Sequence, residues 1–384
     1  MPIDTHLCLV SAQPTPNLTP ALDLATAPRR VILLVSPDMR RRADWVAAVL
    51  GAKGIPCEPW QIQDAWDVEH VQRRVLELLG RESALIARRA IALNATGGTK
   101  PMSIAAYEAF RAYELPIFYV HPENDRLIWL NPAGQASVDL ANRLGFDLFL
   151  RAHGTHLVAS CNTPVPDDRR VLTNRLVAGI GGNARALGTL NWLAAQARET
   201  LVSPPIESRQ RYDRRLAVLL DGFTRLGLLR VVNWRLHFAD EAARFYVNGG
   251  WLEEHVFALL EDLRPRVPVI QDLARSLDIL RETVGGESVA NEIDVACLAE
   301  NRLYLVECKT RTWQGPDAGA AGADALYRLD TLSDLLGGLQ ARAMLVSYRD
   351  LPPRVLRRAA DLGVRVCAGT RLADLARQLA AWLS

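Results

Sequence analysis

The chain has 384 residues, a length that predicts two or three domains. It is 49% hydrophobic and 23% charged, an ordinary globular composition without repeats or low-complexity segments. The formal net charge of +2 is nearly neutral and gives no strong signal of nucleic-acid binding, so any basic surface must be local.

The sequence shows no pattern typical of a membrane span, a signal peptide or a paired-cysteine motif. No apolar run approaches the roughly 18 residues that cross a bilayer, and the first residues lack the charged start and apolar core of a signal peptide. The six cysteines are scattered without a CxxC pair, so we expect reduced thiols and no zinc site. These features predict a cytoplasmic protein that does not associate with membranes.

Short apolar strands alternate with helices over residues 1 to about 150. The predicted strands cover residues 7–10, 31–35, 57–60, 91–94, 117–120 and 127–130. The predicted helices cover residues 20–25, 39–50, 68–79 and 101–113. This alternation predicts a parallel, Rossmann-like sheet.

A glycine-rich segment lies where the fourth predicted strand ends and a helix begins. Its glycines let the backbone approach a ligand closely, and the helix start offers free amides to a phosphate. Threonine hydroxyls and a lysine complete the candidate ligand-binding set, which is Asn94, Thr96, Gly97, Gly98, Thr99 and Lys100. The spacing matches neither Walker A nor GxGxxG. The alternative interpretation is a glycine turn with a threonine cap.

A second polar loop, residues 11–17, follows the first strand. Because the carboxyl ends of parallel strands form one edge of a sheet, this loop should meet the glycine-rich segment there. Its Ser11, Gln13 and Asn17 are candidates to read base or ribose edges.

Together the two loops resemble a CARF domain (CRISPR-associated Rossmann fold) over roughly residues 5 to 145. The resemblance implies a 1–150 domain that forms a homodimer and binds cyclic oligoadenylate, most often cyclic tetra-adenylate. A ring with two-fold symmetry matches a site on the axis of a symmetric dimer.

Residues 151–245 are predicted to be a connector. Residues 151–168 resemble a linker. Helices are expected over residues 170–178, 184–199 and 212–226, with a break at Gly181-Gly182. Residues 228–238 and 244–247 predict a hairpin around residues 239–241. The pattern is similar to a winged helix. Its arginines are either solvated or a patch that guides nucleic acid, and they are Arg209, Arg211, Arg214 and Arg215.

A β-hairpin over residues 291–310 carries the candidate catalytic chemistry. Asp294 lies on its first strand, 300–302 form the turn, and Glu307 and Lys309 share one face at the end of the apolar second strand. Two carboxylates and the backbone carbonyl of Cys308 can hold Mg²⁺ or Mn²⁺, and Lys309 can orient a nucleophilic water. The alternative is a surface hairpin with an ion pair.

Lysine is rare in this chain: only Lys53, Lys100 and Lys309 occur among 45 basic residues. Arginine therefore serves wherever positive charge suffices, and a retained lysine indicates a need for its compact ammonium group. Two of the three lie in the motifs described above.

A helix beginning at Gly249-Gly250-Trp251 and running to about residue 263 precedes the hairpin. It carries Glu253 and Glu254, and His255 is expected to be a packed core residue. After the hairpin we expect a mobile loop over 312–323, helices over 326–336, 353–362 and 372–383, and strands over 343–347 and 364–367.

The 246–384 region resembles the restriction-endonuclease-like PD-(D/E)xK nuclease fold. The resemblance implies catalytic roles for Asp294, Glu307 and Lys309, and a further metal-facing glutamate, either Glu253 or Glu254, with the residue order favouring Glu253. The combined domains are similar to CRISPR ancillary nucleases. They imply an α/β protein that cleaves RNA or DNA in type III CRISPR antiviral defence when cyclic oligoadenylate binds. The alternatives are a constitutive DNA nuclease such as a resolvase and a nucleotide-sensing regulator without catalysis.

Overall fold

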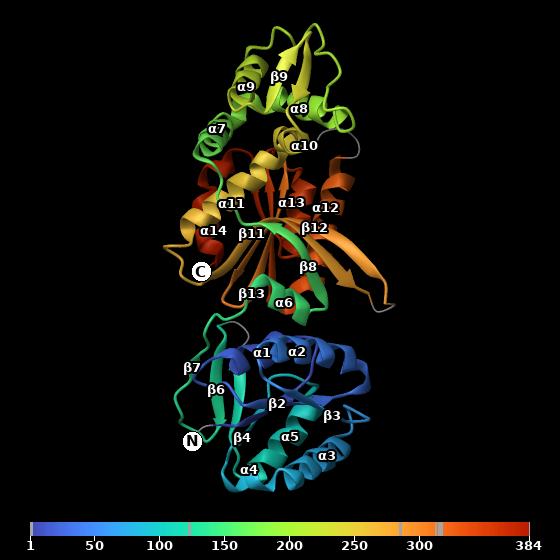
Figure 1. Cartoon of the computed structure of the whole chain (residues 1–384), viewed down its shortest axis with the longest axis vertical. Coiled ribbons are helices and arrows are strands. Elements are labelled where there is room, and N and C mark those ends of the chain that lie inside the picture. Colours follow the sequence, from blue (N-terminus) through green and yellow to red (C-terminus); the bar gives the residue numbers. More distant parts are fainter. Residues whose placement is uncertain (1–2, 122–123, 284–285, 312, 314–317, 384) are drawn as a thin grey trace.

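The computed structural model describes residues 3–121, 124–283, 286–311, 313 and 318–383. It contains two large sheets stacked along the long axis and a helical cap at one end (Figure 1). The α/β fold class predicted from the sequence is confirmed. Among the described residues, no helix is long and apolar enough to cross a membrane.

The N-terminal half is built on a seven-stranded sheet with the order β3-β2-β1-β4-β5-β6-β7. The first five of these are parallel, and β6 and β7 are antiparallel additions at one edge. The strands are β1 (Thr5–Leu9), β2 (Arg30–Val35), β3 (Cys57–Gln61), β4 (Ile91–Asn94), β5 (Ile117–His121), β6 (Arg126–Asn131) and β7 (Val138–Asp139).

Helices cover both faces of this sheet. One layer lies toward the second sheet and consists of α1 (Thr15–Leu22) and α2 (Arg40–Ala52). The other layer lies at the outer end of the molecule (Figure 1) and consists of α3 (Val68–Arg81), α4 (Ser83–Ala87) and α5 (Lys100–Ala112). The parallel order places the carboxyl ends of β1 and β4 side by side, since Cys8 pairs with Asn94.

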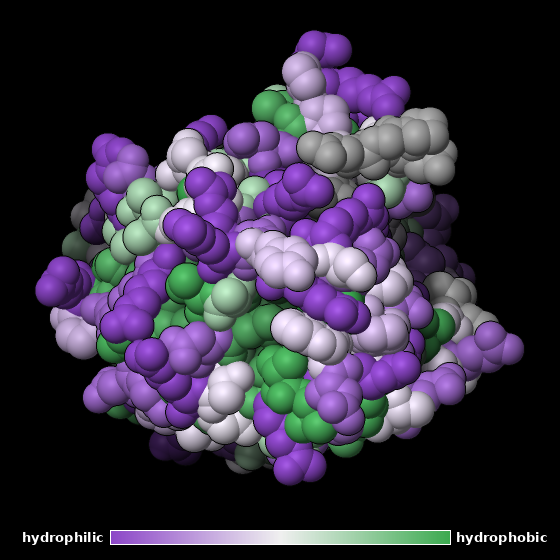
Figure 2. Space-filling view, turned by 90° about the horizontal axis from the view of Figure 1, so that it is seen from above, coloured by the Kyte–Doolittle hydropathy of each residue, from purple (hydrophilic) through white to green (hydrophobic). Residues whose placement is uncertain are grey.

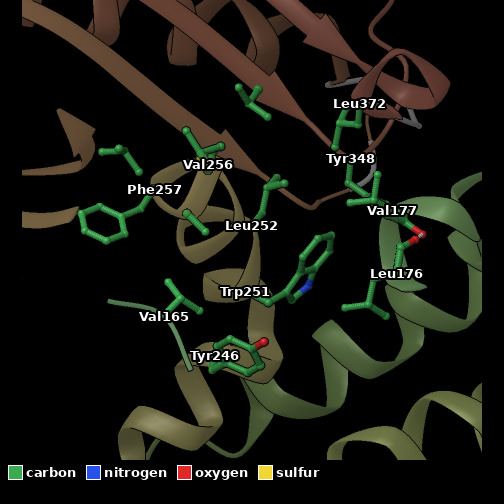
Figure 3. Close-up of a cluster of buried hydrophobic side chains, with 14 of the residues drawn as sticks. Val165, Leu176, Val177, Tyr246, Trp251, Leu252, Val256, Phe257, Tyr348 and Leu372 are labelled. Carbon is green, nitrogen blue, oxygen red and sulfur yellow. Dashed lines mark hydrogen bonds between the residues drawn. The ribbon is translucent and has the colours of Figure 1, made fainter. Parts of the chain in front are cut away.

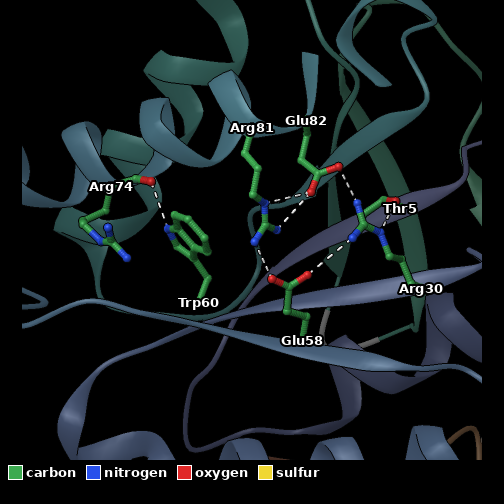
Figure 4. Close-up of polar contacts among 7 residues, drawn as sticks. All are labelled: Thr5, Arg30, Glu58, Trp60, Arg74, Arg81 and Glu82. Atoms are coloured by element: carbon green, nitrogen blue, oxygen red, sulfur yellow. Dashed lines mark hydrogen bonds and ion pairs between the residues drawn. The ribbon is translucent and has the colours of Figure 1, made fainter. Parts of the chain in front are cut away.

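A network of charges fixes the opposite, amino-terminal edge of the same sheet (Figure 4). Arg30 contacts Thr5, Glu58 and Glu82, and Arg81 bridges the same two glutamates. The side chain of Arg81 also stacks on Trp60.

The C-terminal half is built on a six-stranded sheet with the order β15-β14-β13-β12-β11-β8. Its first three strands are parallel and the rest antiparallel. The strands are β8 (Thr155–Cys161), β11 (Ile270–Glu282), β12 (Ser288–Ala299), β13 (Arg302–Lys309), β14 (Ala341–Ser347) and β15 (Arg365–Ala368).

Two helix layers also enclose this second sheet. The pair α11 (Trp251–Leu263) and α14 (Leu375–Leu383) packs on one face with the cap. The other face is covered by α6 (Phe146–Ala152), α12 (Ala318–Gly337) and α13 (Pro353–Asp361). One continuous core joins this face to the N-terminal half: Val46 of α2 and Phe149 of α6 belong to the same cluster as Leu277 of β11.

The cap lies at the end of the molecule farthest from the first sheet (Figure 1). Its helices are α7 (Asp167–Ala178), α8 (Ile180–Gln196), α9 (Arg214–Arg225) and α10 (Glu241–Phe245), with the hairpin β9 (Leu229–Val232) and β10 (Arg235–Phe238). Viewed from this end, the surface is mainly hydrophilic with scattered hydrophobic residues (Figure 2).

Several predicted elements were wrong in detail. Asn17 lies in a helix, because Pro16 suits the first turn of α1. Gly181 and Gly182 lie inside α8, and residues 244–247 are helical because Asp240 caps α10. Residues 318–323 begin α12, while the rest of the loop predicted there is outside the described residues, apart from Trp313. The strands β8 and β11 were not predicted.

Candidate functional site

The predicted hairpin is formed by β12 and β13, and it brings Asp294 to the end of β13. The two strands pair from Val295 with Val306 to Ala299 with Arg302. Beyond that pairing, Asp294 Oδ2 accepts a 2.7 Å hydrogen bond from the backbone N–H of Cys308. A side chain thus continues the ladder, and it fixes one carboxylate against the strand that carries Glu307 and Lys309.

The ammonium group of Lys309 lies between the two hairpin carboxylates. Its Nζ is 2.5 Å from Glu307 Oε1 and 3.6 Å from Asp294 Oδ2. Burial raises the pKa of Asp294 to about 6, with Glu307 adding to the rise and Lys309 opposing it. Burial alone would lower the pKa of Lys309, but the two carboxylates outweigh it and raise the pKa. The hairpin therefore presents two partly buried carboxylates with one ammonium group between them.

The structure separates the two candidate glutamates of α11. Glu253 is buried, its Oε2 has no hydrogen-bond partner, and burial followed by the nearby charge of Asp294 raises its pKa to about 9. Glu254 instead forms a 2.8 Å ion pair with Arg169 of α7. Glu253 is thus the residue that adds a carboxyl group beside the hairpin.

The start of α11 explains how Glu253 reaches this place. Gly249 has a φ of 127°, and a Cβ there would lie 2.3 Å from the hydroxyl oxygen of Thr310, so only glycine lets the end of β13 come this close. Trp251 then anchors the helix edge-to-face on Tyr348 at 5.5 Å between ring centroids (Figure 3). Glu253 follows two residues later. His255 is buried with its pKa lowered to about 4 by burial, as expected of a packed core residue.

The glycine-rich segment and the loop after β1 meet at the carboxyl edge of the first sheet. Two buried asparagines tie them together: Asn94 donates to Asn17 Oδ1 at 3.1 Å, and Asn17 donates to the carbonyl of Leu9 at 3.0 Å. The hydroxyl of Thr96 donates to Asn94 Oδ1 at 2.6 Å. These three side chains therefore hold the two loops in position.

The rest of the glycine-rich segment contributes backbone groups and one positive charge. A Cβ on Gly97 would lie 2.1 Å from the carbonyl oxygen of Leu9, and Gly98 has a φ of 73°, so both positions need glycine. Thr99 caps α5 by accepting the N–H of Met102. Lys100 is exposed at the first position of α5. The loop thus offers a helix N-terminus and one ammonium group to an anion.

The remaining predicted residues lie beside this loop. Ser11 is partly exposed, and its hydroxyl bonds with the backbone of Gln13 at 3.3 Å. The amide of Gln13 reaches the second domain, where a Cβ on Gly338 would lie 2.2 Å from Gln13 Nε2. The structure therefore gathers all nine predicted ligand residues at one edge, and one of them contacts the other half of the chain.

Comparison with known families gives two matches. A model of the Card1 CARF domain matches residues 5–147, and a model of the Card1-like endonuclease domain matches residues 239–384. The crystal structure of protein VC1899 from Vibrio cholerae is 31% identical, with a TM-score of 0.88 over 99% of this chain and 97% of that chain. The chain belongs to the Card1-like family of CARF-domain endonucleases.

Two further structures are similar to this Card1-like chain. Can2 from Sulfobacillus thermosulfidooxidans, solved with cyclic tetra-adenylate, is 26% identical with a TM-score of 0.82 and 99% coverage of both chains. A type III CRISPR DNA nuclease activated by cyclic oligoadenylate is 21% identical with a TM-score of 0.56, over 92% of this chain and 47% of that one, and it supports the fold alone. A search of curated protein sequences gives no match.

The oxygens of the Card1-like endonuclease site suit a hard cation. Among the residues that the structure describes, no three histidine, cysteine, aspartate or glutamate side chains form a metal-binding group. The available set is the carboxylates of Asp294 and Glu307 with the carbonyl of Cys308. That carbonyl should face β12, because Lys309 O accepts from Tyr348 on the β14 side and successive residues alternate. The unpartnered buried oxygen of Glu253 also fits this chemistry.

Two features of this endonuclease site were not predicted from the sequence. Glu292 adds a further negative charge that raises the pKa of Glu253 and of Asp294. Asn191 of α8 donates a 2.9 Å hydrogen bond to the hydroxyl of Thr310, so the cap reaches the end of the β12–β13 hairpin. Glu292 lies two residues before Asp294 on a strand, and that spacing alone indicates a shared face.

Proposed function

We propose that the chain is a metal-dependent endonuclease that cyclic tetra-adenylate activates in type III CRISPR antiviral defence. The observation that carries the nuclease assignment is the group of Asp294, Glu307 and Lys309 at one end of a single hairpin. The resemblance over the full chain to Can2, which was solved with cyclic tetra-adenylate, supports the activator. The substrate is RNA, DNA or both.

In this proposal, Asp294, Glu307 and the Cys308 carbonyl hold Mn²⁺ or Mg²⁺, and Glu253 completes the acidic side of the site. A bound divalent cation lowers the pKa of its water and stabilises charge on a phosphate. Lys309 orients the attacking water and offsets charge on the scissile phosphate, since its Nζ already lies within 4 Å of both carboxylates.

The activator, in this proposal, binds at the carboxyl edge of the first sheet. Ser11, Gln13 and the 96–100 segment contact it, and Asn17 and Asn94 shape the loops around it. The ring lies across the axis of a homodimer, which suits its two-fold symmetry. The six cysteines are all free thiols, consistent with a cytoplasmic protein.

A panel of substrates tests this function. Labelled RNA, single-stranded DNA and supercoiled plasmid are incubated with the protein and Mn²⁺, with and without cyclic tetra-adenylate. The proposal predicts that cleavage of at least one substrate requires the metal and is at least about tenfold faster with the activator than without it. Full cleavage without activator would support a constitutive nuclease instead. Activator binding without any cleavage would support a sensor that lacks catalysis.

A further inference from the structure

A buried polar contact joins the CARF domain to the turn of the catalytic hairpin. Asp125, which follows β5, is 7% exposed, and Asn301, in the turn between β12 and β13, is 1% exposed. Asn301 Nδ2 donates to Asp125 Oδ2. The two residues are 176 positions apart in the sequence, so this contact exists only because the domains pack together.

The turn is held at further points by the same end of the CARF domain. Asn301 Nδ2 also lies 3.4 Å from Asn142 Oδ1. Gln271 of β11 donates both to Asn301 Oδ1 and to the carbonyl of Leu144, each at 2.8 Å. Both polar atoms of the Asn301 side chain are therefore hydrogen-bonded. Two of the partners, Asp125 and Asn142, belong to the CARF domain, and the third, Gln271, is itself bonded to Leu144 of that domain.

Asp125 is tied to the candidate activator site on its other side. Thr19 of α1 donates a 3.0 Å hydrogen bond to Asp125 Oδ1. Two residues earlier on the same short helix, Asn17 accepts from Asn94 at the start of the glycine-rich segment. A displacement of α1 by a ligand on these loops must therefore move Thr19, and with it one oxygen of Asp125.

We propose that Asp125 and Asn301 are positioning residues that couple the activator site to the catalytic hairpin. This inference rests on the proposed function. Through this contact, a shift of α1 on activator binding tilts the turn of the β12–β13 hairpin. The coupling acts on Asp294, Glu307 and Lys309 together, because all three belong to that hairpin.

The geometry of the hairpin makes such a tilt effective. The strands are paired continuously from the turn to Val295 and Val306, and β12 also pairs with β11 and β13 with β14, so a shift at the turn moves these central strands of the sheet together. Glu307 is six residues from Asn301, about 20 Å along an extended strand. Glu253 lies on α11, outside the hairpin, and is anchored there by Trp251. A tilt at the turn therefore changes the position of the hairpin carboxylates relative to Glu253.

The turn allows a clean test of the Asn301 side chain. Glu300 and Asn301 have φ values of 48° and 54°, so glycine at either position relieves backbone strain and keeps the two-residue turn. Asn301→Gly removes the contact with Asp125, whereas Glu300→Gly changes the same turn and leaves the contact in place. Asp125→Ala removes the contact from the other side without touching the hairpin.

The experiment measures cyclic tetra-adenylate binding by calorimetry and the cleavage rate with saturating activator relative to the rate without it. For Asn301→Gly and Asp125→Ala we expect wild-type activator affinity within about fivefold and a stimulation ratio reduced by about 5- to 150-fold, the usual range of allosteric coupling. Glu300→Gly should match the wild type. The double variant should lose less stimulation than the two single losses combined, because each single change already breaks the Asp125–Asn301 contact, although Asn301→Gly also removes the bonds to Gln271 and Asn142.

Hydrogen exchange supplies a readout that a purely structural role would not move. In the wild type, activator should change exchange of the amides of residues 294–309, and in Asn301→Gly this response should vanish while exchange at residues 94–100 still responds. Undiminished stimulation in Asn301→Gly, or an equal loss in Glu300→Gly, would overturn the coupling. A wild type that binds no activator would instead overturn the proposed function, and the coupling would fall with it.

Discussion

Asp294 accepts the backbone N–H of Cys308 at the point where the pairing of β12 and β13 ends. This contact fixes the carboxylate by backbone geometry rather than by a flexible partner. It also leaves Glu307 and Lys309 on the strand beyond, free of cross-strand pairing with β12. The hairpin thus holds a prepositioned acidic group.

Glu307→Gln should reduce cleavage by more than about 100-fold, because loss of an outer partner of a metal ligand already costs 10- to 100-fold. Cyclic tetra-adenylate should still bind with wild-type affinity by calorimetry, since Glu307 lies in the other domain. Glu287→Gln, an exposed change in the same domain, is the control. Cleavage by a clean Glu307→Gln preparation at the wild-type rate would remove Glu307 from the site.

Glu253→Gln and Glu254→Gln should have opposite effects. Glu253 Oε2 has no hydrogen-bond partner, so its replacement should leave the melting temperature nearly unchanged while cleavage is lost. Glu254→Gln should retain cleavage but lose about 1 kcal/mol of stability, because it weakens the ion pair with Arg169. Thermal melts and cleavage assays on both variants test which of the two glutamates belongs to the site. The reverse pattern would assign the site to Glu254.

Lys309→Arg should lower cleavage by about 100-fold or more, although the charge is kept. The lysine Nζ sits within 2.5 Å of Glu307 Oε1 and 3.6 Å of Asp294 Oδ2, and the broader planar guanidinium cannot occupy the same position. Initial rates at saturating Mn²⁺ measure the effect. An active Lys309→Arg enzyme would show that positive charge alone is needed there.

Lys100→Ala should weaken cyclic tetra-adenylate binding by about 10- to 100-fold, the loss expected when one charged hydrogen bond to phosphate is removed. The fold should be unaffected, because Lys100 is exposed and the cap of α5 is made by Thr99. Lys53→Ala, an exposed lysine at the end of α2, is a matched control. Equal affinity in the two variants by calorimetry would exclude Lys100 from the activator site.

Asp125 should make stability depend on pH. Burial raises its pKa from 3.8 to about 6, against the hydrogen bonds from Asn301 and Thr19 and the charge of Arg302, with Asp139 adding to the rise. The folded chain thus holds this proton more tightly than the unfolded chain, so the contribution to stability is complete below about pH 4 and is lost as pH rises through 6.

Asp125→Asn cannot ionise, and its stability relative to the wild type should therefore increase between pH 4 and pH 7 by about 3 kcal/mol, the equivalent of the shift in pKa. Urea unfolding at several pH values measures this difference. Asp44→Asn, which removes an exposed carboxyl group on α2, serves as the control. A difference that stays constant with pH would show that Asp125 has an ordinary pKa.

The β12–β13 hairpin could be predicted from the sequence because its signals are local. Alternating residues mark β12, and the Glu-Cys-Lys end of an otherwise apolar strand marks the site. The glycine-rich segment could also be predicted, because Gly97 and Gly98 stand between a strand and a helix, although the contact that requires Gly97 comes from Leu9 of β1. In both cases, the residues that form the recognisable motif are close together in the chain.

Other elements depend on distant partners and left no local pattern. The edge strand β8 is largely exposed and is stabilised by pairing with β11, more than 100 residues away. The alternation of β11 itself is interrupted at Ser276, which has a φ of 48°. Asn301 was predicted only as a turn residue, because its positive φ accounts for an asparagine. Its contact with Asp125 appears only when the two domains are seen together.

The most direct test of this account is the cleavage rate of the wild-type protein with Mn²⁺, measured with and without cyclic tetra-adenylate, with Glu307→Gln as the blank. The account predicts a rate that rises by at least about tenfold with activator, in keeping with the usual range of coupling between two sites, and no cleavage above background in the blank. Equal rates with and without the activator, or cleavage by the blank at the wild-type rate, would contradict it.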